Sequence, residues 1–156
     1  MIPKPPPRES PLGFLYIPPF RVQGTSVAGE ATAVQVPELD VCFDMGSCPR
    51  AALASKFVAV THGHMDHVGG LPYYCSQRRF QGMGTGTIIC DERVAPAMKR
   101  MMAGFNDLEQ QVTPYELIPM RAEQEIEIKN QVVLRAFPTE HTVPSLGYVV
   151  IEKRSK

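Results

Sequence analysis

Residues 57–67 read Phe57-Val58-Ala59-Val60-Thr61-His62-Gly63-His64-Met65-Asp66-His67. The first five are mostly apolar and rich in β-branched side chains, which is typical of a strand buried on both faces. The next six carry three of the chain's four histidines and one aspartate. Imidazole and carboxylate are ligands that divalent zinc or manganese accepts in proteins. The stretch therefore predicts a metal-binding loop at the carboxyl end of a strand, where α/β sheets usually bind ligands.

Alternation along this loop places His62 and His64 on one side, and Asp66 with His67 follows in the next turn. One short loop can thus serve two adjacent metals. The remaining histidine, His141, is the only one left to supply a further nitrogen donor. The alternative is a solvent-exposed turn whose histidines cap the helix that follows. Capping needs one polar residue rather than four, so we favour the metal site.

The residues around the loop predict a mixed α/β domain. Pro72 stands where the first turn of a helix accepts proline, and no helix breaker follows it until Gly82. Apolar periodicity predicts helices at residues 71–80 and 94–105, and strands at 14–17, 31–36, 39–43, 57–61, 87–90, 115–119, 125–128, 132–137 and 148–151. This order indicates an α/β fold with a mixed sheet covered by helices on at least one face.

Length and composition limit the classes of protein to consider. A chain of 156 residues argues for one domain, which we place at residues 13–156 after a proline-rich tail at residues 1–12. Sixteen Lys and Arg balance sixteen Asp and Glu, so no overall positive field favours a nucleic-acid partner. Cys42, Cys48, Cys75 and Cys90 have neither metal-site nor disulfide-framework spacing, and we expect reduced thiols.

The chain carries no targeting or membrane signal that we can identify. No apolar run approaches the roughly 20 residues that span a bilayer, and the first residues lack the apolar core of a secretion signal. We therefore expect an intracellular and most simply a cytoplasmic protein with no membrane partner.

The pattern His-x-His-x-Asp-His behind an apolar strand resembles the metallo-β-lactamase superfamily, whose members build a dinuclear metal site at the edge of an αββα sandwich. Three further segments, at residues 43–49, 67–72 and 141–148, resemble a narrower family, the short form of ribonuclease Z. That family is made of endonucleases that remove 3′ trailers from precursor tRNA. The likeness runs from about Gly13 to the last residue.

The resemblance implies a role for each matching residue. His62, His64 and His141 would bind a first metal ion and Asp66 with His67 a second, with zinc as the expected ion and manganese or another divalent metal as the alternative. Asp66 would also orient or deprotonate the attacking water, which makes it the candidate catalytic residue. Asp44 is expected to orient the metal loop through hydrogen bonds without touching metal.

The resemblance also implies parts that this chain does not contain. A bridging aspartate and a further histidine belong to the second half of the sandwich in the family, and the sequence stops at Lys156 before either. We therefore expect the amino-terminal half of such an enzyme, binding a single metal ion or little metal, and weakly active or inactive by itself. The expected partners are precursor tRNA and either a second copy or the missing carboxyl-terminal half.

Two further expectations concern surfaces. Arg78 and Arg79 are candidate contacts for RNA phosphates, with a solvated helix face as the alternative. By resemblance, the helix at 71–80 would form a homodimer face anchored by Leu71, Tyr73 and Tyr74.

Two other functions share the metal loop. One is a thioesterase resembling glyoxalase II, which would keep the loop but need neither the segment at 43–49 nor that at 141–148. The other is a non-catalytic subunit that keeps the ligands as a structural metal site. Neither is excluded by the residues themselves.

Overall fold

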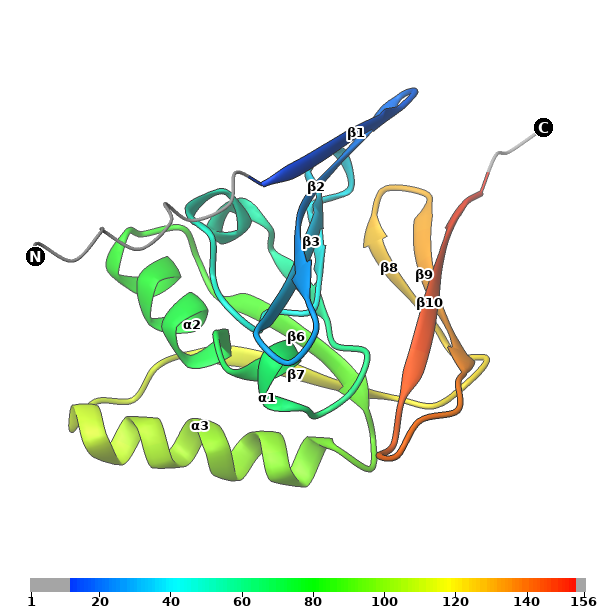
Figure 1. Cartoon of the computed structure of the whole chain (residues 1–156). Coiled ribbons are helices and arrows are strands. Elements are labelled where there is room, and N and C mark those ends of the chain that lie inside the picture. Colours follow the sequence, from blue (N-terminus) through cyan, green and yellow to red (C-terminus); the bar gives the residue numbers. More distant parts are fainter. Residues whose placement is uncertain (1–11, 154–156) are drawn as a thin grey trace, which may run out of the picture.

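The computed structural model describes residues 12–153 (Figure 1). The predicted tail at residues 1–12 therefore lies outside the described residues, except for Leu12. Two β-sheets face each other, and two long helices cover the outer side of the larger sheet. The predicted arrangement of a mixed sheet covered by helices on one face is confirmed.

The larger sheet has seven strands in the order of the sequence, β1 to β7, and the smaller sheet has the order β10-β9-β8. Strands β1 to β4 pair antiparallel, and β4 to β7 pair parallel. The strands are β1 (Gly13–Ile17), β2 (Phe20–Val27), β3 (Ala31–Val36), β4 (Val41–Phe43), β5 (Phe57–Ala59), β6 (Gly86–Asp91), β7 (Tyr115–Met120), β8 (Glu125–Lys129), β9 (Val132–Pro138) and β10 (Leu146–Glu152).

The helices are α1 (Met65–Val68), α2 (Leu71–Phe80) and α3 (Ala95–Glu109), with two short 3-10 turns at Pro37–Leu39 and Arg50–Ala54.

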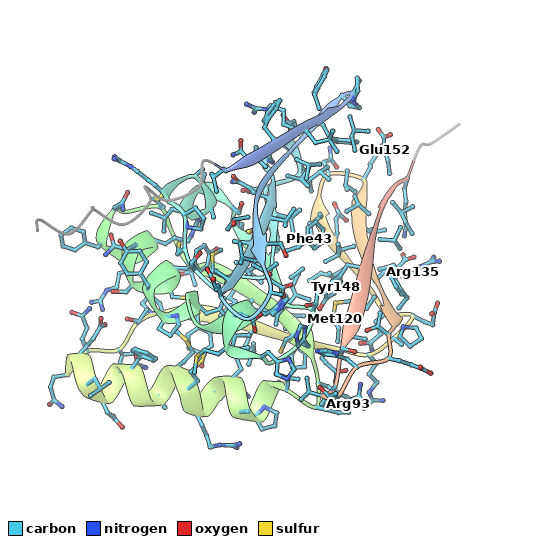
Figure 2. The ribbon with its side chains drawn as sticks, in the orientation of Figure 1. Phe43, Arg93, Met120, Arg135, Tyr148 and Glu152 are labelled. Atoms are coloured by element: carbon cyan, nitrogen blue, oxygen red, sulfur yellow. The ribbon has the colours of Figure 1, made fainter. Side chains whose placement is uncertain are left out.

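The larger sheet separates two apolar cores. One core joins it to α2 and α3, with Tyr74 and Met102 fully buried. The other lies between the sheets, where Figure 2 shows Phe43, Met120 and Tyr148. Because β4 to β6 lie between both cores, they are apolar on both faces, as the sequence indicates for residues 57–61.

Strand β2 is absent from the sequence prediction, which has no strand between residues 17 and 31; Gly24 is a strand breaker by local rules. In the structure Gly24 lies inside β2, because β3 passes so close that a Cβ at position 24 would stand 2.1 Å from the Ala33 carbonyl oxygen. Glycine is thus required here for a close approach of two backbones. The strand predicted at 39–43 begins later, at Val41, because Asp40 has a positive φ of 57° that ends the preceding 3-10 turn.

Other predicted elements agree closely with the structure. Helix α2 has the predicted bounds, and α3 runs four residues beyond the predicted end at Phe105. All four cysteines are free thiols, as expected. Among the described residues, no helix is long and apolar enough to cross a membrane.

Candidate metal centre

The histidine loop leaves the larger sheet at the carboxyl end of β5. Strand β5 is completely buried, and Val60 still bonds to the Ile89 carbonyl before the chain turns outward. Helix α1 begins directly after His64, which occupies the position before the first helical residue but makes no capping hydrogen bond through its side chain. The helix-capping alternative therefore does not account for His64.

His141 reaches the loop because β10 is fastened to the end of β5. The Leu146 N–H donates to the Thr61 carbonyl at 2.9 Å, and the Tyr148 hydroxyl donates to the Val60 carbonyl at 2.7 Å. Ser145 forms an isolated bridge with His62. These contacts join segments about 85 residues apart, and they place the β9–β10 connection, with His141 in it, against the histidine loop.

Three histidines meet at this point. The ligand nitrogens of His62, His64 and His141 lie within 4.8 Å of one another, and His141 Nε2 is 3.2 Å from His64 Nδ1. Two ligands of a tetrahedral zinc ion with bonds of 2.0–2.1 Å stand about 3.3 Å apart. The separation of the His64 and His141 nitrogens agrees with that value. The three nitrogens span up to 4.8 Å, so the group could hold one metal ion with a small adjustment of the rings.

Asp66 and His67 form a second set beside the first. The rings of His62 and His67 have centroids 4.0 Å apart, and His67 Nε2 lies 3.5 Å from Asp66 Oδ2. The same Asp66 oxygen accepts a hydrogen bond from the Gly29 N–H at 2.9 Å. A closed metal site uses more than two ligands, so Asp66 and His67 do not complete a second site by themselves. Together with His62, His64 and His141, these two residues form one continuous cluster of all five predicted ligands.

Asp44 lies behind the cluster and is 3% exposed. Its Oδ2 is 2.8 Å from His67 Nδ1, and its Oδ1 accepts a bond from the Thr61 N–H at 2.7 Å. The Thr61 hydroxyl donates to Asp44 and also lies 2.9 Å from His62 Nδ1. Since a hydroxyl has one proton, His62 Nδ1–H must be the donor to Thr61. His67 therefore turns its Nδ1 to Asp44 and His62 turns its Nδ1 to Thr61, so that Nε2 of each ring faces the cluster.

Burial and neighbouring groups shift the pKa values of His62, Asp44 and Asp66. Burial, followed by the neighbouring His67, His141 and His64 rings, lowers the pKa of His62 to about 4. The ring is therefore neutral near pH 7, which is the form that binds metal. Burial raises the pKa of Asp44, although the hydrogen bonds from His67 and Thr61 oppose that shift. At Asp66 burial also acts to raise the pKa, but the Gly29 N–H and other contacts outweigh it and the pKa is lowered.

Three positions that support the site are missing from the sequence prediction. Gly29 at the β2–β3 turn, with φ of 74°, gives its N–H to Asp66. Thr61 links Asp44 to His62. Gly46 lets the chain pass under the loop, since a Cβ there would stand 1.7 Å from the Asp66 carbonyl oxygen. Of the three, only Gly46 had a signal in the sequence, as part of the segment 43–49. The contacts of Gly29 and Thr61 depend on how distant segments of the chain come together, which the sequence pattern does not show.

The two predicted RNA contacts differ in the structure. Arg78 is 5% exposed, and its guanidinium donates to the carbonyls of Leu53, Ser55, Met83 and Gly84. The structure does not support the prediction for Arg78, because the side chain is buried and four of its five N–H donors bond to backbone carbonyls. Arg79 is exposed on α2 and donates to the Val112 carbonyl at 2.8 Å. Arg79 stays a prediction.

The three predicted dimer anchors differ in their exposure to solvent. Leu71 and Tyr74 are fully buried in the core under α2, so neither can anchor a partner chain. Tyr73 is 56% exposed and is the member of this set that faces outward.

Comparison with known protein families agrees with this geometry. The family model described as "Beta-lactamase superfamily domain" matches residues 45–156, which include every predicted metal ligand. The chain belongs to this superfamily. Within it the chain is a member of the ribonuclease Z family, because it is 34% identical over 142 residues to the nuclear ribonuclease Z of Triticum aestivum, covering 91% of this chain and 81% of that protein.

Other relatives are longer. The chain is 36% identical over 137 residues to a chloroplastic tRNase Z of Arabidopsis thaliana, covering 88% of this chain but 39% of that protein. Among solved structures, the short form of human tRNase Z superposes with a TM-score of 0.55 at 22% identity, covering 92% of this chain and 62% of that one. This likeness shows that the fold is the α/β metallo-β-lactamase fold, as predicted.

Proposed function

We propose that this chain carries the metal-binding half of a zinc-dependent endoribonuclease that removes 3′ trailers from precursor tRNA. The observation that supports the proposal is the meeting of His62, His64 and His141 beside Asp66 and His67. Membership of the ribonuclease Z family supports the choice of substrate.

The histidine group suits zinc by its three nitrogen donors, and the 3.2 Å between the His64 and His141 nitrogens agrees with tetrahedral zinc. His62, His64 and His141 would hold one ion and leave a position for water, and Asp66 with His67 would hold a second ion more weakly. Bound zinc lowers the pKa of its water toward about 7 and neutralises charge on a phosphate. Manganese would suit the carboxylate of the second site.

The protein's own groups prepare the ligands. Asp44 bonds to His67 Nδ1 and is linked to His62 Nδ1 through Thr61. These bonds fix the orientation and the tautomer of both rings, so that Nε2 of each ring is available to a metal ion. Asp66 has one oxygen fixed by Gly29, which leaves its other oxygen to accept a proton from water or to bind metal. We propose Asp66 as the catalytic residue that orients the attacking water.

Metal binding is tested by elemental analysis of the purified 156-residue chain after zinc loading and gel filtration. We expect about one tightly held zinc per chain, and a loss of at least tenfold in affinity for His64→Ala. Asp107→Asn on the exposed side of α3 is the matched control and should bind as the parent does. A chain that never retains zinc, with His64→Ala unchanged, would contradict the proposed site.

Activity is tested by incubating the zinc-loaded chain with a precursor tRNA transcript and, separately, with an acyl-glutathione thioester. Release of the 3′ trailer that is lost in Asp66→Asn supports the nuclease. Thioester turnover without RNA cleavage would instead support a thioesterase. Retained zinc with neither activity would support a non-catalytic metal-binding subunit, unless a carboxyl-terminal half supplied in trans restores cleavage.

Assembly and compartment stay predictions. Tyr73 is the exposed aromatic residue of α2 on which we propose a homodimer face. Sedimentation of the parent chain and of Tyr73→Ala would test it, with a dimer that dissociates in the variant as the expected result. The cytoplasm stays the predicted compartment, although the two relatives described above are named for the nucleus and the chloroplast.

A further inference from the structure

A hollow of about 580 Å³ opens beside the histidine cluster. Residues 139–145 of the β9–β10 connection form most of its wall, and His141 is among them. The wall is completed from another part of the chain by Arg93, which follows β6 and precedes α3. Figure 2 shows Arg93 at the foot of the β9–β10 hairpin. One arginine therefore faces the same space as a predicted metal ligand.

Asp91 fixes the plane of the Arg93 guanidinium. Asp91 Oδ1 accepts from Arg93 Nε at 2.9 Å, and Asp91 Oδ2 accepts from Arg93 Nη2 at 2.5 Å. Asp91 Oδ1 also accepts the Arg93 N–H at 2.8 Å, so that backbone and side chain are held by one carboxylate. Asp91 is 3% exposed, whereas the Arg93 side chain is 61% exposed. The pair thus has a buried anchor and an accessible tip.

This arrangement leaves donors unused. A guanidinium has five N–H donors, and the bond to Asp91 occupies one on Nε and one on Nη2. Among the described residues, Arg93 Nη1 makes no hydrogen bond. An arginine held in one orientation loses little side-chain entropy when it binds a phosphate oxygen. Backbone phosphates supply most of the sequence-independent affinity for nucleic acid.

We propose that Arg93 binds a backbone phosphate of the RNA next to the bond that is cut, with Asp91 as its positioning residue. This inference rests on the proposed function, and it names a residue that brings substrate to the histidine cluster. Arg93 takes no part in the ligand set. Its role is to hold one phosphate group of the RNA in the hollow that it shares with His141.

Two other charged residues, Glu140 and Arg121, allow the role of Arg93 to be tested by comparison. Glu140 lines the same wall as Arg93 and carries the opposite charge, so it opposes phosphate binding there. Arg121 provides a matched control, because it bonds to Glu92 at 2.6 Å, is 71% exposed and does not line the hollow. Loss of Arg93, loss of Glu140 and loss of Arg121 should therefore act in three different ways.

The test is fluorescence anisotropy with a labelled precursor tRNA transcript and the full 156-residue chain in EDTA, so that no RNA is cut. Binding is measured as a function of salt for the parent, Arg93→Ala, Arg93→Lys, Glu140→Gln and Arg121→Ala. We expect Arg93→Ala to weaken binding about tenfold, the effect of losing one charge-assisted hydrogen bond. The slope of log affinity against log salt should fall by about 0.7–1, the value for one phosphate contact.

The other variants complete the pattern. Arg93→Lys should keep the salt slope but recover only part of the affinity, because lysine lacks the fork that Asp91 orients. Glu140→Gln should tighten binding, and Arg121→Ala should leave affinity within about twofold of the parent. Equal effects of Arg93→Ala and Arg121→Ala, with the parent binding RNA, would overturn the inference and leave the proposed nuclease intact. A parent chain that binds no RNA would overturn both.

Discussion

Asp44 Oδ2 and His67 Nδ1 lie 2.8 Å apart, although 23 residues separate them in the sequence. In the proposed metal site Nε2 of His67 would be the ligand atom, because Nδ1 is engaged by Asp44. Asp44 would thus act on the proposed metal site by orienting His67, without being a ligand itself. Asp44 directly follows β4 with a positive φ of 60°, and its side chain bonds to Thr61 after β5 and to His67 in the loop.

Replacing Asp44 by Asn should weaken metal binding by about 10- to 100-fold, the usual effect of removing a hydrogen-bond partner behind a metal ligand. The amide keeps the size of the side chain but loses the charge and one acceptor, so His67 and Thr61 are no longer both held. Competition with a zinc indicator dye measures the affinity. Asp107→Asn controls for the loss of one negative charge, and equal affinities for the two variants would contradict the role given to Asp44.

Two glycine substitutions should change stability in opposite directions. Gly46→Ala should destabilise the chain by about 2 kcal/mol or more, because the new Cβ would collide with the Asp66 backbone carbonyl. Gly104→Ala adds a Cβ with nothing within 4 Å on helix α3, and should stabilise by up to about 1 kcal/mol. Urea unfolding followed by circular dichroism gives both values. A neutral Gly46→Ala would show that the loop does not need this close approach.

Arg78 and Arg79 are neighbours on α2, but their replacement should change the unfolding free energy by very different amounts. Arg78→Ala leaves the carbonyls of Leu53 and Met83 without their guanidinium donor, and we expect a loss of about 2–3 kcal/mol in unfolding free energy. Arg79→Ala is exposed and should cost less than about 0.5 kcal/mol. Thermal unfolding measures both. A larger loss for Arg79→Ala than for Arg78→Ala would contradict the buried role of Arg78.

The cysteines should resist alkylation while the chain is folded. Burial raises the pKa of Cys42, Cys75 and Cys90 to about 12 and that of Cys48 to about 11. An unfolded thiol has a pKa of about 8.5. At about pH 8 the native chain should therefore react with iodoacetamide at least tenfold more slowly than the urea-unfolded chain, since the thiolate is the nucleophile. Mass spectrometry counts the labels, and rapid native labelling of Cys42 would contradict this burial.

The same thiols give a pH dependence of stability with a definite sign. Their pKa in the folded chain lies above the unfolded value, so their contribution is complete below about pH 8.5 and is lost as pH rises from there toward 12. The free energy of unfolding in urea should fall as the pH rises over this range. The fall should be smaller in Cys42→Ala, when each chain is compared with its own value at about pH 8. A flat profile would contradict the shift.

Much of the fold follows from local pattern. The bounds of α2 and β3 agree with the prediction, because apolar spacing and Pro72 act over a few residues. Strand β2 is different. Its Gly24 is a breaker by local rules, and only the approach of β3 makes a glycine necessary inside a strand. The pattern could not show that approach, since it depends on how two segments pair.

The sequence by itself determined the donor set: three histidines and an aspartate within six residues are held together by the chain, whatever the fold. Tertiary structure decided which partners join them. His141 arrives because Leu146 bonds to Thr61 across 85 residues, and Arg78 is withdrawn from solvent because α2 packs on the sheet. Contacts of that separation depend on strand order and layer packing, which side-chain spacing along a single segment does not encode.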